Sequence, residues 1–130
     1  MANTTANPDA VHVPAGGYSH SVVVPGGSRV FYLAGQIGLD VDGHAPADFV
    51  GQADQAFRNV VAILEHHGLG LDDVVRMTHY LTSPADLAAY RQVRSRWLGD
   101  LRPASTLLIV AGLARPELKI EIEVVAAVAG

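Results

Sequence analysis

Residues 102–125 read RPASTLLIVAGLARPELKIEIEVV, and this stretch decides the fold more than any other. It contains two runs typical of β-strands, separated by a turn that Gly112 and Pro116 mark. Charged and apolar residues alternate in the second run, and a period of two sends them to opposite faces of a strand. The charged face holds Lys119, Glu121 and Glu123, and the apolar face holds Leu118, Ile120 and Ile122. We therefore predict a half-buried strand with a row of carboxylates, a pattern that on most proteins is simply a solvated face.

Toward the N-terminus, two short β-branched runs at residues 19–24 and 29–34 flank the turn Pro25-Gly26-Gly27. Two strands joined by such a turn predict a β-hairpin. Residues 1–12 are polar and show no periodic pattern, so we expect a flexible tail there. The remaining residues, 13–130, have the length of a single domain.

The middle of the chain predicts two helices with a strand between them. Apolar residues within 53–64 recur at the spacing of an amphipathic helix. Residues 74–82 alternate as a strand does, with His79 on the apolar side, where a buried and satisfied histidine is the usual finding. A second helix is expected from Ser83 to about Gly99. The order ββαβαββ predicts an α+β fold, a mixed sheet with both helices on one face.

Composition narrows the choice of partners. Hydrophobic residues make up 49% of the 130 residues and charged residues 17%, which suits a packed core and an apolar surface hidden in an oligomer. The net charge is −4 and Lys119 is the only lysine. A surface that follows nucleic-acid phosphates is therefore poorly supported, and we expect no nucleic-acid partner.

Several other classes of site are also disfavoured. The chain has no cysteine, so it offers no disulfide, thiolate metal site or thiol nucleophile, and it fits a cytoplasmic protein. His66 and His67 are adjacent on a helix and point about 100 degrees apart, which is unsuited to a shared metal ion. We expect no metal and no cofactor. No secretory signal and no apolar run of membrane-spanning length is present, so no membrane partner is expected.

Four motifs run through the chain. They read Gly17-Tyr18-Ser19-His20, Ala34-Gly35-Gln36-Ile37, Gln55-Ala56-Phe57-Arg58-Asn59-Val60 with Asp72-Asp73-Val74-Val75-Arg76-Met77-Thr78, and Pro103-Ala104-Ser105-Thr106 followed by Ile120-Glu121-Ile122-Glu123. In this order and spacing they resemble the motifs of the reactive-intermediate deaminases, the RidA or YjgF family, over residues 13–128. The resemblance implies a chorismate-mutase-like homotrimer whose sheets pack into a central barrel, with small-molecule clefts between subunits.

The resemblance also implies roles for three residues. Glu121 matches the glutamate that orients an attacking water, and a carboxylate in a half-buried cleft suits that task. Tyr18 matches a tyrosine of the pocket wall, and Gly35 matches a glycine whose backbone approaches the ligand. Each has a structural alternative: a surface or interface carboxylate, a packing anchor and a bulge glycine, respectively.

Three further residues complete the expected site. Ser105 and Thr106 have no base nearby in the sequence, so we expect them to hydrogen-bond a substrate rather than attack it. Among the six histidines, His20 is the best placed to line a pocket, because it stands two residues after Tyr18.

One departure from the family pattern bears on the reaction. Family members that hydrolyse imines carry an arginine just before the Ser/Thr-Thr/Cys pair, where this chain has Ala104. That arginine is thought to pair with the substrate carboxylate, a bidentate role that alanine does not fill. Arg102 lies two positions earlier, on the same face of an extended strand, and we list it as a substitute although it is displaced by roughly 6 to 7 Å.

The working hypothesis is an enzyme that hydrolytically deaminates or tautomerises a small imine or enamine metabolite, with Glu121 as its acid/base centre. Ala104 implies a substrate that differs from simple 2-iminoacids. The alternative is a trimer that binds a metabolite or a protein without turnover. A nuclease is disfavoured by the acidic balance of charges.

Overall fold

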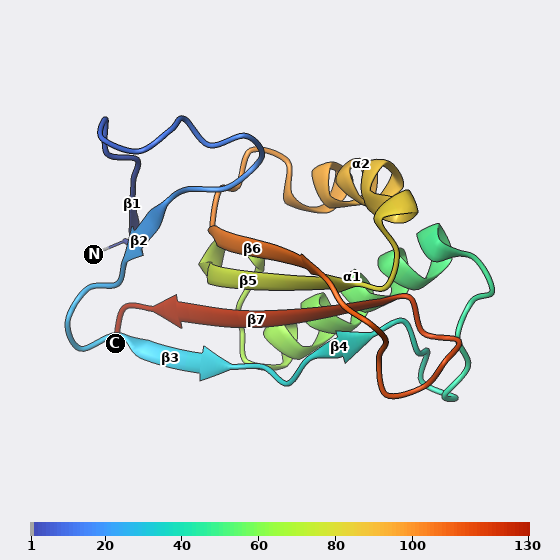
Figure 1. Ribbon diagram of the computed structural model, residues 1–130. Coiled ribbons are helices and arrows are strands. Elements are labelled where there is room, and N and C mark those ends of the chain that lie inside the picture. The colour runs from blue at the N-terminus through green and yellow to red at the C-terminus, as the bar shows by residue number, and fades with distance from the viewer. Residues whose placement is uncertain (1) are drawn as a thin grey trace.

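The computed structural model describes residues 2–130 and shows one mixed sheet with two helices on the same face (Figure 1). The strand order is β3-β7-β5-β6, and β4 also pairs with β7. Among the named strands of residues 2–130, only the β5–β6 pair is parallel. The sheet strands are β3 (Arg29–Tyr32), β4 (Gln36–Ile37), β5 (Val74–Leu81), β6 (Ala104–Ile109) and β7 (Ile120–Val128). The predicted α+β class and the placement of both helices are confirmed.

The two helices cover the sheet face that carries the core. They are α1 (Phe49–His66) and α2 (Leu87–Leu98), and two short 3₁₀ turns, Leu71–Asp73 and Pro84–Asp86, lead into β5 and α2. Asp48 caps α1 by accepting a hydrogen bond of 3.2 Å from the amide of Gly51. Phe57 of α1 and Tyr90 of α2 are fully buried and stack against each other. The apolar stripes of both helices therefore meet above the sheet.

The predicted hairpin of residues 19–24 and 29–34 is wrong. β2 (Ser21–Val23) pairs instead with β1 (Thr4–Ala6), and β3 pairs with β7. The local turn signal pointed to the neighbour in sequence, whereas the nine-residue β7 offers β3 a longer edge on the main sheet. The expected flexible tail also differs, because β1 forms a two-stranded ribbon with β2 and the Asn3 amide donates to the carbonyl of Ala127 at 3.0 Å.

The alternation of residues 118–123 is confirmed. Leu118, Ile120 and Ile122 are at most 1% exposed and face the helices, whereas Glu121 and Glu123 lie on the opposite, open face of the sheet. The two strand runs of residues 102–125 are not neighbours, since β5 lies between β6 and β7. The carboxylate row is therefore placed beside β5 and β4, where it meets side chains far away in sequence.

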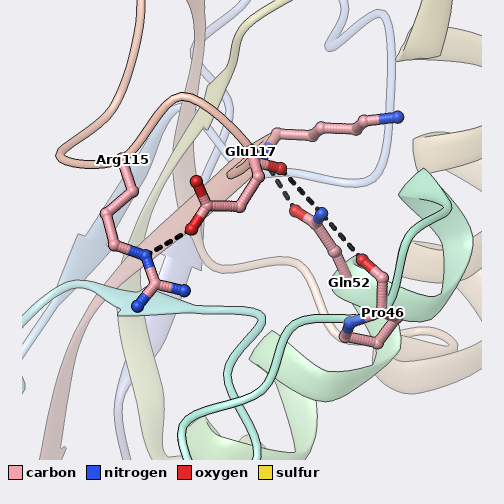
Figure 2. A network of polar contacts seen from close by, with 5 residues as sticks. Pro46, Gln52, Arg115 and Glu117 are labelled. Carbon is pink, nitrogen blue, oxygen red and sulfur yellow. Dashed lines mark hydrogen bonds and ion pairs between the residues drawn. The ribbon is translucent and has the colours of Figure 1, made fainter.

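A buried glutamine fixes the segment that enters β7 (Figure 2). Gln52 of α1 is 1% exposed, and its amide nitrogen donates to the carbonyls of Pro46 at 3.0 Å and Glu117 at 2.9 Å. Its amide oxygen accepts from the backbone N–H of Lys119 at 2.8 Å. Both N–H donors of the amide and its oxygen are thus engaged, and the contacts with Glu117 and Lys119 tie α1 to the residues just before Glu121.

Candidate functional site

The expected site residues fall into two groups on opposite faces of the sheet. Glu121, Gly35 and Thr106 belong to the open face, which neither helix covers. Tyr18, Arg102 and Ser105 line a cavity on the helix-covered face. A single subunit therefore does not bring all of the predicted residues together.

On the open face, Glu121 stands against Gly35. Glu121 is the Cα partner of Ile37 on β4 and of Tyr80 on β5. Gly35 lies in the gap between β3 and β4, and a Cβ added there would lie 2.8 Å from the carboxyl carbon of Glu121. A side chain at position 35 would displace the Glu121 carboxylate from this place, so the glycine allows the carboxylate to lie directly against the backbone.

The two glutamates of β7 differ in their partners. The Tyr80 hydroxyl donates to Glu123 Oε1 at 2.8 Å, and this hydrogen bond to a carboxylate raises the pKa of Tyr80. Within residues 2–130, the side chain of Glu121 has neither a hydrogen bond nor an ion pair. Glu121, Glu123 and Tyr80 line a shallow pocket of about 360 Å³ with the β6–β7 loop, and in that pocket Glu121 holds the carboxylate that is free to bind water.

A cation that sequence reasoning missed lies on the same face. Arg76 of β5 is the Cα partner of Ala104, and its guanidinium donates to the Thr106 hydroxyl at 2.8 Å. Arg76 forms no ion pair with any described residue. The alternation of residues 74–82 already placed Arg76 on the polar side of its strand, but its position beside Ala104 depends on the parallel pairing of β5 with β6.

The second group lines a cavity of about 530 Å³ between α2, β6 and the segment around Tyr18. Arg91, Arg94 and Arg102 are part of its wall. The Arg102 guanidinium donates to the carbonyls of Gly99 at 2.9 Å and Leu101 at 3.1 Å. β6 begins only at Ala104, so Arg102 is not on the strand, and the expectation that it shares the face of Ala104 is not met.

A buried histidine joins this cavity to the core. His79 is 1% exposed, its Nδ1 is hydrogen-bonded to the Tyr90 hydroxyl, and its Nε2 lies 2.8 Å from Ser105 Oγ. Burial, with Arg94 and Arg76 nearby, lowers the pKa of His79 to about 3, so its imidazole is neutral. The predicted satisfied core histidine is confirmed. Ser105 does have an imidazole beside it, because parallel pairing brings together residues 26 positions apart.

His20 lies apart from both groups. Its Nε2 is 2.6 Å from the carbonyl oxygen of His12, and its ring packs edge-on against Tyr18 at 5.6 Å. It supports the Tyr18 ring and is not among the residues that line the cavity. No cluster of three potential metal ligands occurs in the part of the chain that the structure describes.

Comparison with known proteins shows the family of this chain. The sequence model of the family described as Endoribonuclease L-PSP matches residues 9–128. The chain belongs to the RidA/YjgF family. A RutC family protein of Pyrococcus abyssi is 36% identical over 115 residues, which cover 87% of each chain. A mouse relative, named 2-iminobutanoate/2-iminopropanoate deaminase, is 32% identical over 97% of this chain and 89% of its own.

Solved structures of the RidA/YjgF family share the fold. A Rid-family protein of unknown function from Yersinia pestis has a TM-score of 0.86 at 32% identity and covers 98% of this chain and 100% of its own. RidA from an Antarctic Psychrobacter has a TM-score of 0.73, also at 32% identity, with 96% and 99% covered. The likeness extends over at least 96% of each chain.

Proposed function

We propose that this protein hydrolytically deaminates or tautomerises a small imine or enamine metabolite, with Glu121 as the acid/base centre. The observation that carries the proposal is the free Glu121 carboxylate, held against Gly35 on the open sheet face while Glu123 is engaged by Tyr80. The names of the mouse and other relatives as 2-iminobutanoate/2-iminopropanoate deaminases support the same chemistry.

In the proposed hydrolysis, Glu121 accepts a proton from a bound water as the water oxygen attacks the imine carbon. The C=N π bond opens and the nitrogen takes up a proton from solvent, which gives a carbinolamine. Glu121 then returns its proton to the nitrogen as the C–N bond breaks, and the carbinolamine hydroxyl releases its proton to solvent as the C=O bond forms. One imine and one water thus give one carbonyl compound and ammonia. No redox step and no cofactor is required by this balance.

We further propose that the complete cleft forms between subunits of a homotrimer. The free carboxylate and the arginine-lined cavity lie on opposite faces of one sheet, so one chain does not bring them to a common substrate. The open face also exposes apolar side chains, with Tyr32 82% and Leu108 45% exposed, and such a face favours a subunit interface. Glu121 of one subunit would then face the cavity of its neighbour.

Reaction class is tested by generating an imine in the assay with an amino-acid oxidase and trapping the imine that remains with semicarbazide. A protein that lowers the trapped imine in proportion to its concentration supports hydrolysis. A binding trimer without turnover is the second candidate, favoured by the 530 Å³ cavity, which does not depend on Glu121. It predicts ligand binding with no change in trapped imine for any imine tested.

No helix within residues 2–130 has the length and apolar character needed to cross a membrane. We propose a cytoplasmic site of action and no nucleic-acid partner, on the strength of the net charge of −4 and a single lysine.

A further inference from the structure

The cavity beside α2 offers hydrogen-bond donors and positive charge without a compensating carboxylate. Three arginines line it, and no aspartate or glutamate does, although the whole chain carries a net charge of −4. Arg94 and Arg102 both approach Gly17: a Cβ there would lie 3.7 Å from Arg102 Nη1 and closer still to Arg94 Nη1. Two guanidinium groups of like charge thus share one corner of the cavity.

Both arginines also bond to backbone carbonyls, which is the structural explanation for their presence. Arg94 Nη2 donates to the carbonyl of Gly17, and Arg102 Nη1 donates to those of Gly99 and Leu101. A guanidinium has five N–H donors, so each retains unused ones. Neither forms an ion pair with a described residue, and burial together with Arg102 lowers the pKa of Arg94. An anion in the cavity would relieve that repulsion.

The hydrogen-bond chain behind the cavity turns Ser105 into a further donor. Tyr90 is fully buried, burial raises the pKa of its phenol, and His79 Nδ1 is its only hydrogen-bond partner among the described residues. A buried hydroxyl must use its proton, so Tyr90 donates to Nδ1. The neutral imidazole then carries its proton on Nε2 and donates to Ser105 Oγ. The Ser105 proton is therefore left for the cavity.

This direction of donation also excludes a serine nucleophile activated by His79. A general base needs a free lone pair facing the hydroxyl, and here the lone pair of Nδ1 faces Tyr90 while Nε2 carries a proton. The Tyr90–His79–Ser105 chain contains a histidine next to a serine, as a catalytic relay does. Here, however, the protons are donated toward the serine, whereas a general base would accept the serine proton.

We propose that the cavity binds a small organic carboxylate with an apolar body, held at its head by Arg94, Arg102 and Ser105, with Tyr90 and His79 as positioning residues. The apolar body is inferred from Leu87, Leu98 and Leu107 in the wall and from a volume of about 530 Å³, far more than an inorganic anion fills. The claim that such a carboxylate is the substrate of the cleft rests on the proposed function. The claim that the cavity binds it does not, because none of the residues proposed to hold it lies on the sheet face of Glu121.

Calorimetry on the full chain tests the ligand class with phenylacetate, the neutral phenylacetamide and inorganic phosphate as probes. Phenylacetate should bind at least about tenfold more tightly than either of the others, because the amide lacks the charge and phosphate lacks the apolar body. Equal affinity for the amide, tighter binding of phosphate, or no binding of phenylacetate would each overturn the proposal.

Substitutions in the cavity wall test which side chains hold the carboxylate of the ligand. Arg102→Gln and Ser105→Ala should each weaken phenylacetate binding about tenfold or more, and Arg94→Gln should do the same. Arg96→Gln is the matched control, since Arg96 lies on the same helix, outside the cavity, 3.7 Å from Asp54. Arg102→Gln keeps the contact between Arg94 and Gly17, so it reports on binding even if Arg94→Gln disturbs that segment. An Arg96→Gln loss as large as the others would contradict the assignment.

Nitrogen-15 NMR of histidine tests the positioning role. The wild-type protein should show His79 as the tautomer protonated on Nε2. Tyr90→Phe removes the hydroxyl that holds the Nδ1 lone pair, so it should shift the Nδ1 resonance and weaken phenylacetate binding severalfold. A wild-type His79 protonated on Nδ1 would contradict the proposed direction of donation from Tyr90 through His79 to Ser105. Glu121→Gln should bind phenylacetate at least as tightly as the wild type while turnover falls, so that failure of binding and failure of the proposed catalysis are told apart.

Discussion

The Tyr80 hydroxyl donates a 2.8 Å hydrogen bond to Glu123, although Tyr80 is the Cα partner of Glu121. The phenol therefore reaches diagonally along β7 and occupies the second glutamate of the row. The Glu123 carboxylate is thus engaged, whereas the Glu121 carboxylate, in front of Gly35, has no hydrogen bond or ion pair within residues 2–130.

Stability should fall in mild acid because of His79. Its folded pKa of about 3 lies below the usual value of 6.5, so the unfolded chain binds the proton first as the pH drops. The stability is complete above pH 6.5 and is lost progressively between pH 6.5 and 3. Urea unfolding at fixed protein concentration should give a free energy of unfolding about 1.4 kcal/mol lower per chain at pH 5.5 than at pH 7.5.

The control for that measurement is His79→Gln, which removes the titrating group. The variant is expected to be less stable at both pH values but to lose this part of the pH dependence. A variant that shows the same decrease as wild type between pH 7.5 and 5.5 would assign the effect to the other five histidines.

Replacing Gln52 should destabilise the entry to β7. Gln52→Leu keeps a similar volume but leaves the carbonyls of Pro46 and Glu117 and the amide of Lys119 without their partner. Unpaired buried groups cost about 1 to 3 kcal/mol each, so we expect a loss of at least about 2 kcal/mol in urea unfolding. Gln55→Leu, one turn further along α1, is the comparison, and a similar loss there would show that Gln52 has no special role.

The chain should form a trimer in solution. Three chains of 13.7 kDa give about 41 kDa in light scattering at micromolar concentration. Leu108→Asp places a charge on the exposed open face and should shift the mass toward the monomer, whereas Val41→Asp, at a fully exposed loop position, should not. A monomeric wild type would refute the cleft between subunits.

Simple 2-iminoacids should be poor substrates. Ala104 stands where the family resemblance implies a carboxylate-binding arginine, and loss of a charged, hydrogen-bonded partner typically costs about 2 to 5 kcal/mol, roughly 30- to 4,000-fold. Semicarbazide should therefore trap nearly as much 2-iminopropanoate with this protein present as without it. Turnover equal to that of an arginine-bearing relative would mean that another cation, with Arg76 the first to examine, replaces the missing one.

The sequence was sufficient for the features that depend on local period. Alternation along residues 118–123 predicted which side chains are buried, and the apolar stripe of residues 53–64 predicted the buried side of α1. The same reasoning placed His79 in the core. Each of these depends on contacts that repeat every two or every 3.6 residues, so a short window of sequence contains the information.

Features that depend on strand partners were not available from the sequence. The turn at Pro25–Gly27 suggested a hairpin, yet β3 pairs with β7 across nearly 100 positions. Arg76 was overlooked as a neighbour of Ala104, and His79 as a neighbour of Ser105, because both pairs form through the parallel β5–β6 register. The substitute arginine expected from strand spacing, Arg102, precedes the start of β6 and lines the cavity on the helix-covered face of the sheet.

The most direct test of Glu121 as the acid/base centre compares Glu121→Gln with Glu123→Gln in the trapped-imine assay, on a substrate that the wild type turns over. Both changes keep the side-chain shape and remove one carboxylate from the same strand face. Glu121→Gln should lower turnover about 100-fold or more with the trimer intact, as expected for a lost general base, and Glu123→Gln should cost little. Equal losses, or a loss only at Glu123, would contradict the assignment of the free carboxylate as the acid/base centre.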